Sequence, residues 1–225
     1  MTNANSGRRA LPPGIYGITA EKFSRGRSNV EVAAAMIEGG IAVLQYREKR
    51  PAKSQRAMLE ECRQLRALTR QAGIPFIVND HVDLAILVEA DGVHVGQDDL
   101  PVAEVRRLLG PNRIIGLSTH SPAQAAAAVS AGADYIGVGP IFATATKEDV
   151  CAPVGLAYLD HVVGSCPLPF VAIGGIKEHN LPEVVRHGAR TVCLVTAIVG
   201  ATDIAATVRG LRAILEQAGP PATQL

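Results

Sequence analysis

Polar residues that could hold a phosphorylated ligand occur in short clusters along the chain. Arg47 and Lys49 lie two positions apart, a spacing that lets both cations point the same way from a strand end and bind one anion. Asp80 and Asp99 belong to two other clusters, and Mg²⁺ typically takes one or two protein carboxylates together with substrate phosphate oxygens. The pair at 174–175 is two glycines, which would let the backbone approach a second phosphate closely. These residue types indicate binding of anionic small molecules.

Each cluster also has a purely structural interpretation. Arg47 and Lys49 could be solvated charges, Asp99 could cap a helix, and the two glycines could end a strand. The histidines form no catalytic triad that can be argued from the sequence. His94 lies inside an expected strand, and a histidine there is more often a hydrogen-bonded interior residue than a catalyst. The residues alone therefore indicate a phosphate-binding site without naming its substrates.

A recurring pattern supplies the elements that would position these clusters. Ala-rich helical stretches end in a glycine and lead into short β-branched runs, as in 33–40 into 42–47 and 125–132 into 135–141. A glycine there adopts the left-handed cap conformation, and a run that is apolar on both faces fits a covered parallel sheet. The other strands are expected at 14–19, 76–79, 92–96, 114–118, 170–175 and 191–198.

Alternating strands and helices imply parallel strands with right-handed crossovers, in either a closed barrel or an open doubly wound sheet. The chain has no G-x-G-x-x-G turn after its first strand and no Walker loop, and 225 residues suit one compact barrel. We therefore predict an α/β protein with a single (β/α)8 TIM barrel, the catalytic domain, over residues 14–219. Residues 1–13 are expected to form a flexible N-terminal segment, and 220–225 a flexible tail.

The bulk composition narrows the possible partners. A net charge of +1 gives no overall field for nucleic acid or a membrane surface, and no apolar run is clean enough to span a bilayer. The four cysteines lack metal-site spacing, and the first 13 residues do not resemble a signal peptide. We expect a cytoplasmic protein with small-molecule substrates and neither nucleic-acid nor membrane partners. Its exposed barrel helices would allow a homodimer.

The clusters match, in order, the motifs of the thiamine-phosphate synthase family, which the chain resembles from about residue 15 to residue 215. They read Q-Y-R-E-K at 45–49, V-N-D at 78–80, A-D-G-V-H-V-G-Q-D-D at 90–99, G-L-S-T-H at 116–120, G-A-D-Y-I-G-V-G-P-I-F-A-T-A-T-K at 132–147, I-G-G-I at 173–176 and V-T-A-I at 195–198. Any one motif would be weak support, whereas the ordered series is specific.

This resemblance implies a Mg²⁺-dependent transferase of thiamine biosynthesis that couples a hydroxymethylpyrimidine diphosphate to a thiazole phosphate. Diphosphate would leave first, and the thiazole nitrogen would capture the pyrimidine cation. The pyrimidine diphosphate would be held by Gln45, Tyr46, Arg47, Glu48, Lys49, Asn79, Ser118 and Lys147, of which Arg47, Lys49, Ser118 and Lys147 would be catalytic. The thiazole phosphate would be held by Thr144, Ala145, Thr146, Gly175, Val195 and Thr196, and the Mg²⁺ by Asp80 and Asp99.

Three positions depart from the family pattern, and none removes a charge. Tyr46 stands where the family usually has Leu, and we expect its side chain to point away from the face of its neighbours. Ala143 stands in place of Pro, and Thr196 stands in place of Ser and keeps the hydroxyl. Two alternatives remain, a thiazole tautomerase-type isomerase on the same barrel and a non-catalytic phosphate-binding barrel. A sugar-phosphate isomerase or epimerase would need an acid–base pair across the site, and the sequence offers none.

Overall fold

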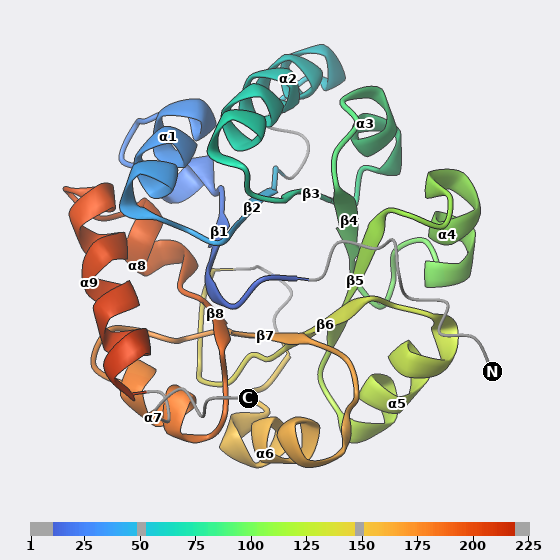
Figure 1. Ribbon diagram of the computed structural model, residues 1–225, viewed down its shortest axis with the longest axis vertical. Coiled ribbons are helices and arrows are strands. Elements are labelled where there is room, and N and C mark those ends of the chain that lie inside the picture. The colour runs from blue at the N-terminus through green and yellow to red at the C-terminus, as the bar shows by residue number, and fades with distance from the viewer. Residues whose placement is uncertain (1–10, 49–52, 147–150, 219–225) are drawn as a thin grey trace.

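The computed structural model describes residues 11–48, 53–146 and 151–218, and these form one closed barrel of parallel strands surrounded by helices (Figure 1). The strands are β1 Gly14–Ile18, β2 Val43–Tyr46, β3 Phe76–Asn79, β4 Gly92–Val95, β5 Ile114–Thr119, β6 Tyr135–Val138, β7 Phe170–Ile173 and β8 Thr191–Cys193. The helices are η1 Glu21–Phe23, α1 Asn29–Gly39, α2 Gln55–Ala72, α3 Val82–Leu87, α4 Val102–Leu109, α5 Pro122–Ala131, α6 Gly155–Ser165, α7 Leu181–Arg186, α8 Val195–Val199 and α9 Ile204–Ala218.

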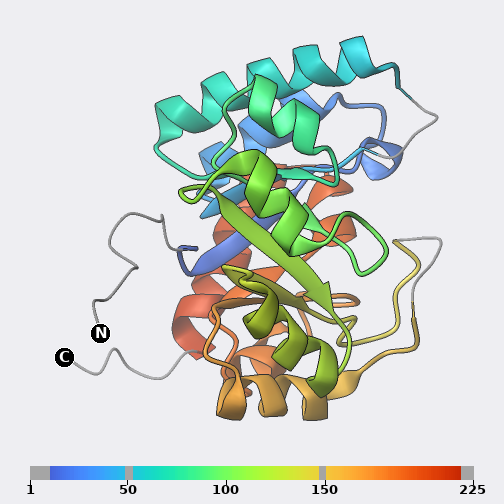
Figure 2. The ribbon, with the colours of Figure 1, turned by 90° about the vertical axis from the view of Figure 1, so that its right-hand side faces the viewer.

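Each strand pairs with its neighbours in sequence, and β1 closes the barrel by pairing with β8, with Ile15 opposite Val192. The (β/α)8 prediction is confirmed. Figure 2 shows the strands inclined across the molecule between the layers of helices, as barrel closure requires. Because all strands are parallel, their carboxyl ends share one mouth, where barrels carry their sites.

Local sequence signals account for where the helices begin and end. Ser28 and Glu31 form a reciprocal capping box at the start of α1, and Ser54 caps α2. Gly40, Gly73 and Gly132 take the left-handed conformation after α1, α2 and α5, as predicted.

The barrel has two apolar regions, because successive residues of a strand face opposite sides of the sheet. Outward residues such as Leu44 and Val78 pack beneath the helices. The barrel interior is filled by a smaller cluster: Tyr16, Ile18, Val43, Ile77, Ile114, Tyr135, Val171 and Cys193. This interior cluster includes two tyrosines, so the floor of the mouth carries hydroxyl groups.

Several strand ends differ from the sequence prediction. The expected strand 191–198 stops at Cys193, and its second half forms the short helix α8. The strands expected over 135–141 and 170–175 stop at Val138 and Ile173. Apolar β-branched runs do not distinguish a strand from a short buried helix, so only tertiary packing settled these ends.

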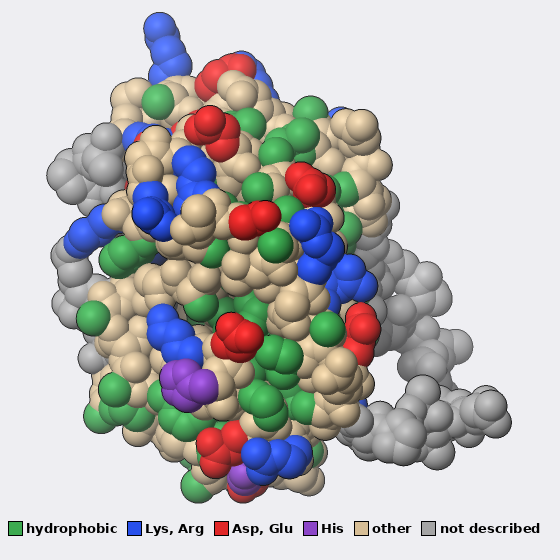
Figure 3. All heavy atoms as spheres, turned by 90° about the vertical axis from the view of Figure 1, so that its left-hand side faces the viewer, with side chains coloured by type: hydrophobic (Ala, Val, Ile, Leu, Met, Phe, Trp, Pro, Cys, Tyr) green, Lys and Arg blue, Asp and Glu red, His purple; other side chains and the backbone are tan. Residues whose placement is uncertain are grey.

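Charges of both signs are interspersed on the side of the barrel shown in Figure 3. One pair joins neighbouring helices, with Arg209 of α9 lying 3.6 Å from Glu38 of α1. No helix within the described ranges is both long and apolar enough to cross a membrane. The predicted domain limits remain predictions, since residues 1–10 and 219–225 lie outside the described part of the chain.

Candidate active site

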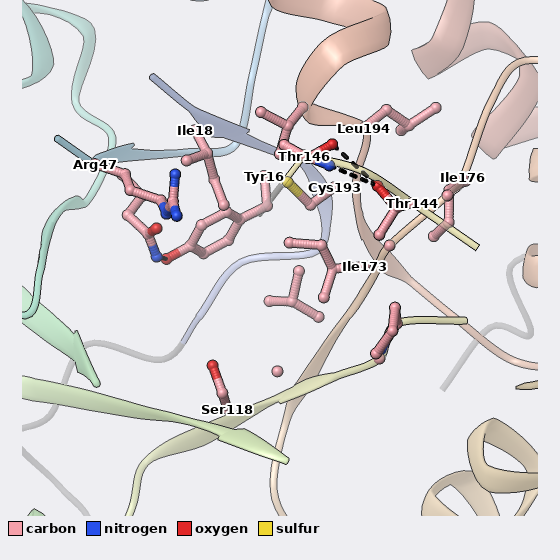
Figure 4. A pocket seen from close by; sticks show the side chains of 18 of the residues that line it. Tyr16, Ile18, Arg47, Ser118, Thr144, Thr146, Ile173, Ile176, Cys193 and Leu194 are labelled. Carbon is pink, nitrogen blue, oxygen red and sulfur yellow. Dashed lines mark hydrogen bonds between the residues drawn. The ribbon is translucent and has the colours of Figure 1, made fainter. Parts of the chain in front are cut away.

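A cavity of about 310 Å³ lies at the carboxyl ends of the strands. Its walls come from strands and loops all around the barrel, with the hydroxyls of Thr144 and Thr146 across the cavity from Arg47 (Figure 4). The polar side chains that line it, cysteines aside, are Tyr16, Gln45, Arg47, Asn79, His94, Asp98, Ser118, His120, Tyr135, Thr144, Thr146, Lys177 and Thr196. The structure therefore brings together polar groups from strand ends that are distant in sequence.

Arg47 provides the cation on the β2 side of the cavity. Its backbone N–H donates to Thr19 Oγ1 at 3.0 Å, which fixes the chain just beyond the strand. Its Nε atom is buried and has no hydrogen-bond partner within the described residues. Burial lowers the pKa of Arg47, while the nearby carboxylates of Asp80 and Glu48 act in the opposite direction. A guanidinium with unused hydrogen-bonding capacity is suited to receive an anion.

Tyr46 and Glu48 face away from the cavity, because side chains alternate along β2 and its extension. The Tyr46 hydroxyl donates to Glu61 of α2 at 2.8 Å, and Glu48 accepts from Asn29 at 3.2 Å. The orientation expected for Tyr46 is therefore confirmed. Neither residue lines the cavity, so the structure does not support a side-chain role for them in binding the pyrimidine diphosphate, and their assignment remains a prediction.

A chain of hydrogen bonds crosses the barrel interior beneath the cavity, and we call it the interior polar chain. Gln45 donates to the Tyr16 hydroxyl at 3.0 Å, which lies 2.8 Å from the Tyr135 hydroxyl. Tyr135 then contacts His94 Nδ1 at 2.9 Å, and His94 Nε2 contacts Ser118 Oγ at 2.9 Å. Burial raises the pKa of both tyrosines, so their hydroxyls stay protonated. His94 is thus the satisfied interior histidine that was expected, and it also lines the cavity.

The sequence predicted neither tyrosine as part of the site. Tyr16 and Tyr135 occupy inward-facing positions of β1 and β6, 119 residues apart. The only sequence signal was a polar hydroxyl within an otherwise apolar strand, and it does not reveal the partner across the barrel.

The carboxylates proposed for Mg²⁺ follow the adjacent strands β3 and β4. Asp80 has a left-handed backbone conformation, with φ of 61°, and its N–H donates to His94 O at 2.9 Å. Asp99 Oδ2 accepts from the Gly96 N–H at 2.7 Å, so this carboxylate also holds its own loop. Asp98, not Asp80 or Asp99, lines the cavity. Together they place hard oxygen ligands beside the mouth, which fits the donor set that Mg²⁺ prefers.

A second acidic cluster lies outside the cavity. Oxygens of Glu21, Glu48 and Glu61 lie within 4.8 Å of one another. The Lys53 ammonium donates to Glu21 and Glu61 and lies 3.8 Å from Glu48. The single positive charge of this lysine offsets part of the repulsion among the three carboxylates.

The opposite side of the cavity is built from the loops after β6 and β7. Thr144 Oγ1 lies 3.0 Å from Thr146 Oγ1 and accepts from the Thr146 N–H at 3.3 Å, whereas Ala145 is exposed and does not line the cavity. Gly175 has φ of +66°, and a Cβ there would lie 2.6 Å from Ala143 O. Only glycine fits this conformation and this contact without strain, so the two loops can pack together.

Val195 and Thr196 begin α8 and complete this side of the cavity. The Lys177 ammonium donates to Thr196 Oγ1 at 2.9 Å, so a lysine that the sequence interpretation passed over belongs to the same group. Its only sequence signal was its position directly after the I-G-G-I run. Two predicted residues, Lys49 and Lys147, lie outside the described residues.

The closed barrel and its mouth, lined by cations, hydroxyls and close-packed glycines, are those of a (β/α)8 protein whose cavity suits phosphorylated small molecules. Comparison with known proteins agrees: residues 15–198 match the family model described as thiamine monophosphate synthase. The chain belongs to this family.

Curated relatives have similar lengths and are named thiamine-phosphate synthase. The protein from Pelotomaculum thermopropionicum is 65% identical over 208 residues, covering 92% of this chain and 94% of the relative. The protein from Lawsonia intracellularis is 53% identical over 203 residues, covering 90% and 93%. Among solved structures, thiamine phosphate pyrophosphorylase from Pyrococcus furiosus superposes with a TM-score of 0.83 at 36% identity, covering 91% of this chain and 96% of that one.

Proposed function

We propose that the chain is a thiamine-phosphate synthase, which joins a hydroxymethylpyrimidine diphosphate to a thiazole phosphate and releases diphosphate. Its family and its relatives make it a transferase acting on small molecules. One observation carries the proposal: Arg47 lines one side of the cavity and Thr144, Thr146 and Gly175 line the other, so the cavity offers two separate regions suited to anions. A coupling enzyme needs both regions, whereas an isomerase acting on one phosphorylated thiazole needs only the second.

The pyrimidine diphosphate would bind on the β2–β3 side. Arg47 would donate hydrogen bonds to the diphosphate oxygens, and its Nε atom has no other partner within the described residues; Gln45 and Asn79 line the same cavity. Ser118 lines the same cavity from the end of β5, and its hydroxyl lies 2.9 Å from His94 Nε2. Lys49 and Lys147 are assigned to the diphosphate from the sequence alone, and their roles remain predictions.

The bond exchange itself needs little acid–base chemistry. The bond from the pyrimidine methylene carbon to the diphosphate oxygen breaks, and its electron pair leaves with the diphosphate. The lone pair of the thiazole nitrogen then forms the new carbon–nitrogen bond. Arg47 would neutralise charge that develops on the leaving group, and the two binding regions would align the rings.

Mg²⁺ is the proposed cofactor, held by Asp80 and Asp99 with Asp98 nearby. Bound there, it would supply positive charge to the diphosphate oxygens. The donor chemistry supports this assignment, because carboxylates beside a phosphate site are the ligands that Mg²⁺ prefers.

A coupling assay tests the function and the metal together. Purified protein receives both substrates, with Mg²⁺ or with EDTA. We expect thiamine phosphate and diphosphate in equal amounts with Mg²⁺, and a large loss of rate with EDTA. No product from a folded sample would overturn the coupling function, and isomerisation of the thiazole phosphate would then identify the tautomerase alternative. An undiminished rate in EDTA would overturn only the metal assignment.

Location and assembly remain parts of the proposal. The near-neutral net charge and the cysteines without metal-site spacing support a cytoplasmic enzyme without a nucleic-acid partner. A homodimer is the assembly that exposed barrel helices allow, and light scattering of the purified chain would distinguish it from a monomer.

A further inference from the structure

The groups assigned to the thiazole phosphate are all uncharged. Thr144, Thr146 and Thr196 offer hydroxyls, and Gly175 and Val195 offer backbone amides. A phosphate monoester carries between one and two negative charges near neutral pH. Moving such an anion out of water is costly unless a cation accompanies it. Backbone amides and hydroxyls can hold a phosphate, and a cation on this side of the cavity would lower the cost further.

Lys177 is placed to supply this positive charge. It lines the cavity, and its ammonium lies 2.9 Å from Thr196 Oγ1, at the start of α8. An ammonium has three donors, so this bond leaves others for a ligand. Among the described residues, no carboxylate lies within 4.0 Å of its Nζ atom.

The backbone that carries Lys177 is also held in place. Its N–H donates to Asn180 Oδ1 at 2.7 Å, and Asn180 Nδ2 donates to Gly175 O at 3.2 Å. The Asn180 side chain thus bridges the lysine to the glycine that packs against the loop after β6. The stem of the lysine therefore starts from a fixed position at the mouth.

Lys53 shows what a structural lysine looks like in this molecule. Its ammonium is surrounded by Glu21, Glu48 and Glu61 outside the cavity, so its charge is neutralised within the fold. The charge of Lys177 has a hydroxyl neighbour instead. This contrast between the two lysines favours a ligand as the source of the anion that pairs with Lys177.

We propose that Lys177 binds the phosphate of the thiazole phosphate and makes the site select the phosphorylated thiazole over the free alcohol. The inference rests on the proposed function, because that function supplies the identity of the second substrate. Thr196 would orient the ammonium, and the neutral donors of Thr144, Thr146 and Gly175 would complete the phosphate pocket.

Steady-state kinetics with two alternative acceptors test this role. Lys177→Met keeps the aliphatic stem but loses the charge, so the KM for thiazole phosphate should rise about 10- to 100-fold. The KM for the pyrimidine diphosphate should change less than about twofold, since that substrate contacts the other side. The preference for thiazole phosphate over the free thiazole alcohol should fall by the same factor as the KM rises. Lys177→Arg should restore most of the preference, and Lys22→Met, at an exposed lysine outside the cavity, should change nothing.

A merely structural lysine would affect both acceptors equally, so an unchanged preference in Lys177→Met would overturn the proposal. A second test, by calorimetry, does not depend on coupling activity. Inorganic phosphate can be titrated calorimetrically into Arg47→Met and into the Arg47→Met/Lys177→Met double variant. Binding about tenfold or more weaker in the double variant supports Lys177 as the anion ligand even if the wild type fails to couple. Equal or absent binding in both would overturn it.

Discussion

At the scale of single residues, the fold holds the Arg47 guanidinium in the cavity with one hydrogen-bond donor unused. Its Nε atom is buried without a partner within the described residues, and burial lowers its pKa. A buried charge that is incompletely hydrogen bonded is costly, and an incoming diphosphate would relieve that cost. In the proposed reaction, the binding energy of the diphosphate would thereby act on the group that leaves.

Replacing Arg47 by Met should lower kcat/KM for the pyrimidine diphosphate by about 100-fold or more, because a charge-assisted contact to the leaving group is lost. The KM for thiazole phosphate should stay within about twofold. Initial rates at varied concentrations of each substrate measure both values. Arg209→Met on α9 is the matched control, since Arg209 is an exposed residue paired only with Glu38 in the described structure. Normal turnover by the Arg47 variant would contradict its catalytic role.

The interior polar chain makes a different prediction at this scale. Tyr135→Phe removes a hydroxyl that lies between Tyr16 and His94, leaving both without that partner. We expect a loss of about 1–3 kcal/mol in the free energy of unfolding, measured by urea denaturation. Tyr158→Phe is the control, since its hydroxyl donates to Thr119 alone within the described residues and its loss should cost less. A smaller loss for Tyr135→Phe than for Tyr158→Phe would argue against a cooperative chain.

At the scale of elements, two loops from adjacent strands together build the side of the cavity that we propose for the thiazole phosphate. The loop after β6 carries Thr144 and Thr146, and the loop after β7 carries Gly175. Their contact is so close that a methyl group at 175 would meet Ala143 O at 2.6 Å and the Phe142 carbonyl carbon at 2.7 Å. The position of the two threonines therefore depends on a glycine in another loop.

Gly175→Ala should push the loop after β6 outward and raise the KM for thiazole phosphate about tenfold or more, with little change for the pyrimidine diphosphate. Gly73→Ala is a well-matched control, because Gly73 has nearly the same φ, +69°, but open space around its Cβ position. It should cost about 1 kcal/mol of stability and leave both KM values unchanged. Equal kinetic effects of the two variants would show that backbone strain alone matters.

At the scale of the whole molecule, buried acids keep their protons at high pH. Burial raises the pKa of Cys62 from its ordinary 9.0 to about 12, and the pKa values of Cys193, Tyr16 and Tyr135 also rise. The unfolded chain releases these protons first, so the stability they contribute is complete below about pH 9 and is lost as the pH rises further.

The free energy of unfolding should therefore fall above pH 9, by about 1.4 kcal/mol per pH unit for each such thiol. Urea denaturation at pH 7.5, 9, 9.5 and 10 measures the slope. Cys62→Ala should reduce the slope by about one thiol's contribution, although the variant starts from a lower stability. A stability that stays constant up to pH 10 would contradict the prediction.

Much of the fold was predictable because its signals are local. The glycines after α1, α2 and α5 and the Ser28 capping box belong to short stretches of chain, and each acts without a distant partner. The candidate site was predictable where polar residues stand at strand ends, as for Arg47, Asn79 and Ser118. Parallel strands place all such ends at one mouth, so order along the chain was enough.

The predictions that the structure does not support concern which face of a strand a residue occupies and where a strand ends. Tyr46 and Glu48 belong to the same motif as Arg47, but the alternation of β2 turns them toward the helices. Val195 and Thr196 read as strand and form the start of α8. A motif specifies which residues occur together, and the register of the strand decides which of them face the cavity.

The sequence by itself determined the number and order of the elements, the barrel class and the polar clusters at the strand ends, because periodicity and capping act over a few residues. Only the tertiary structure decided that Tyr16 meets Tyr135 and that Lys177 meets Thr196. These contacts join separate strands and loops, so they depend on closure of the barrel and on the register between its strands. Those two properties arise from packing of the whole chain, and no local stretch of residues encodes them.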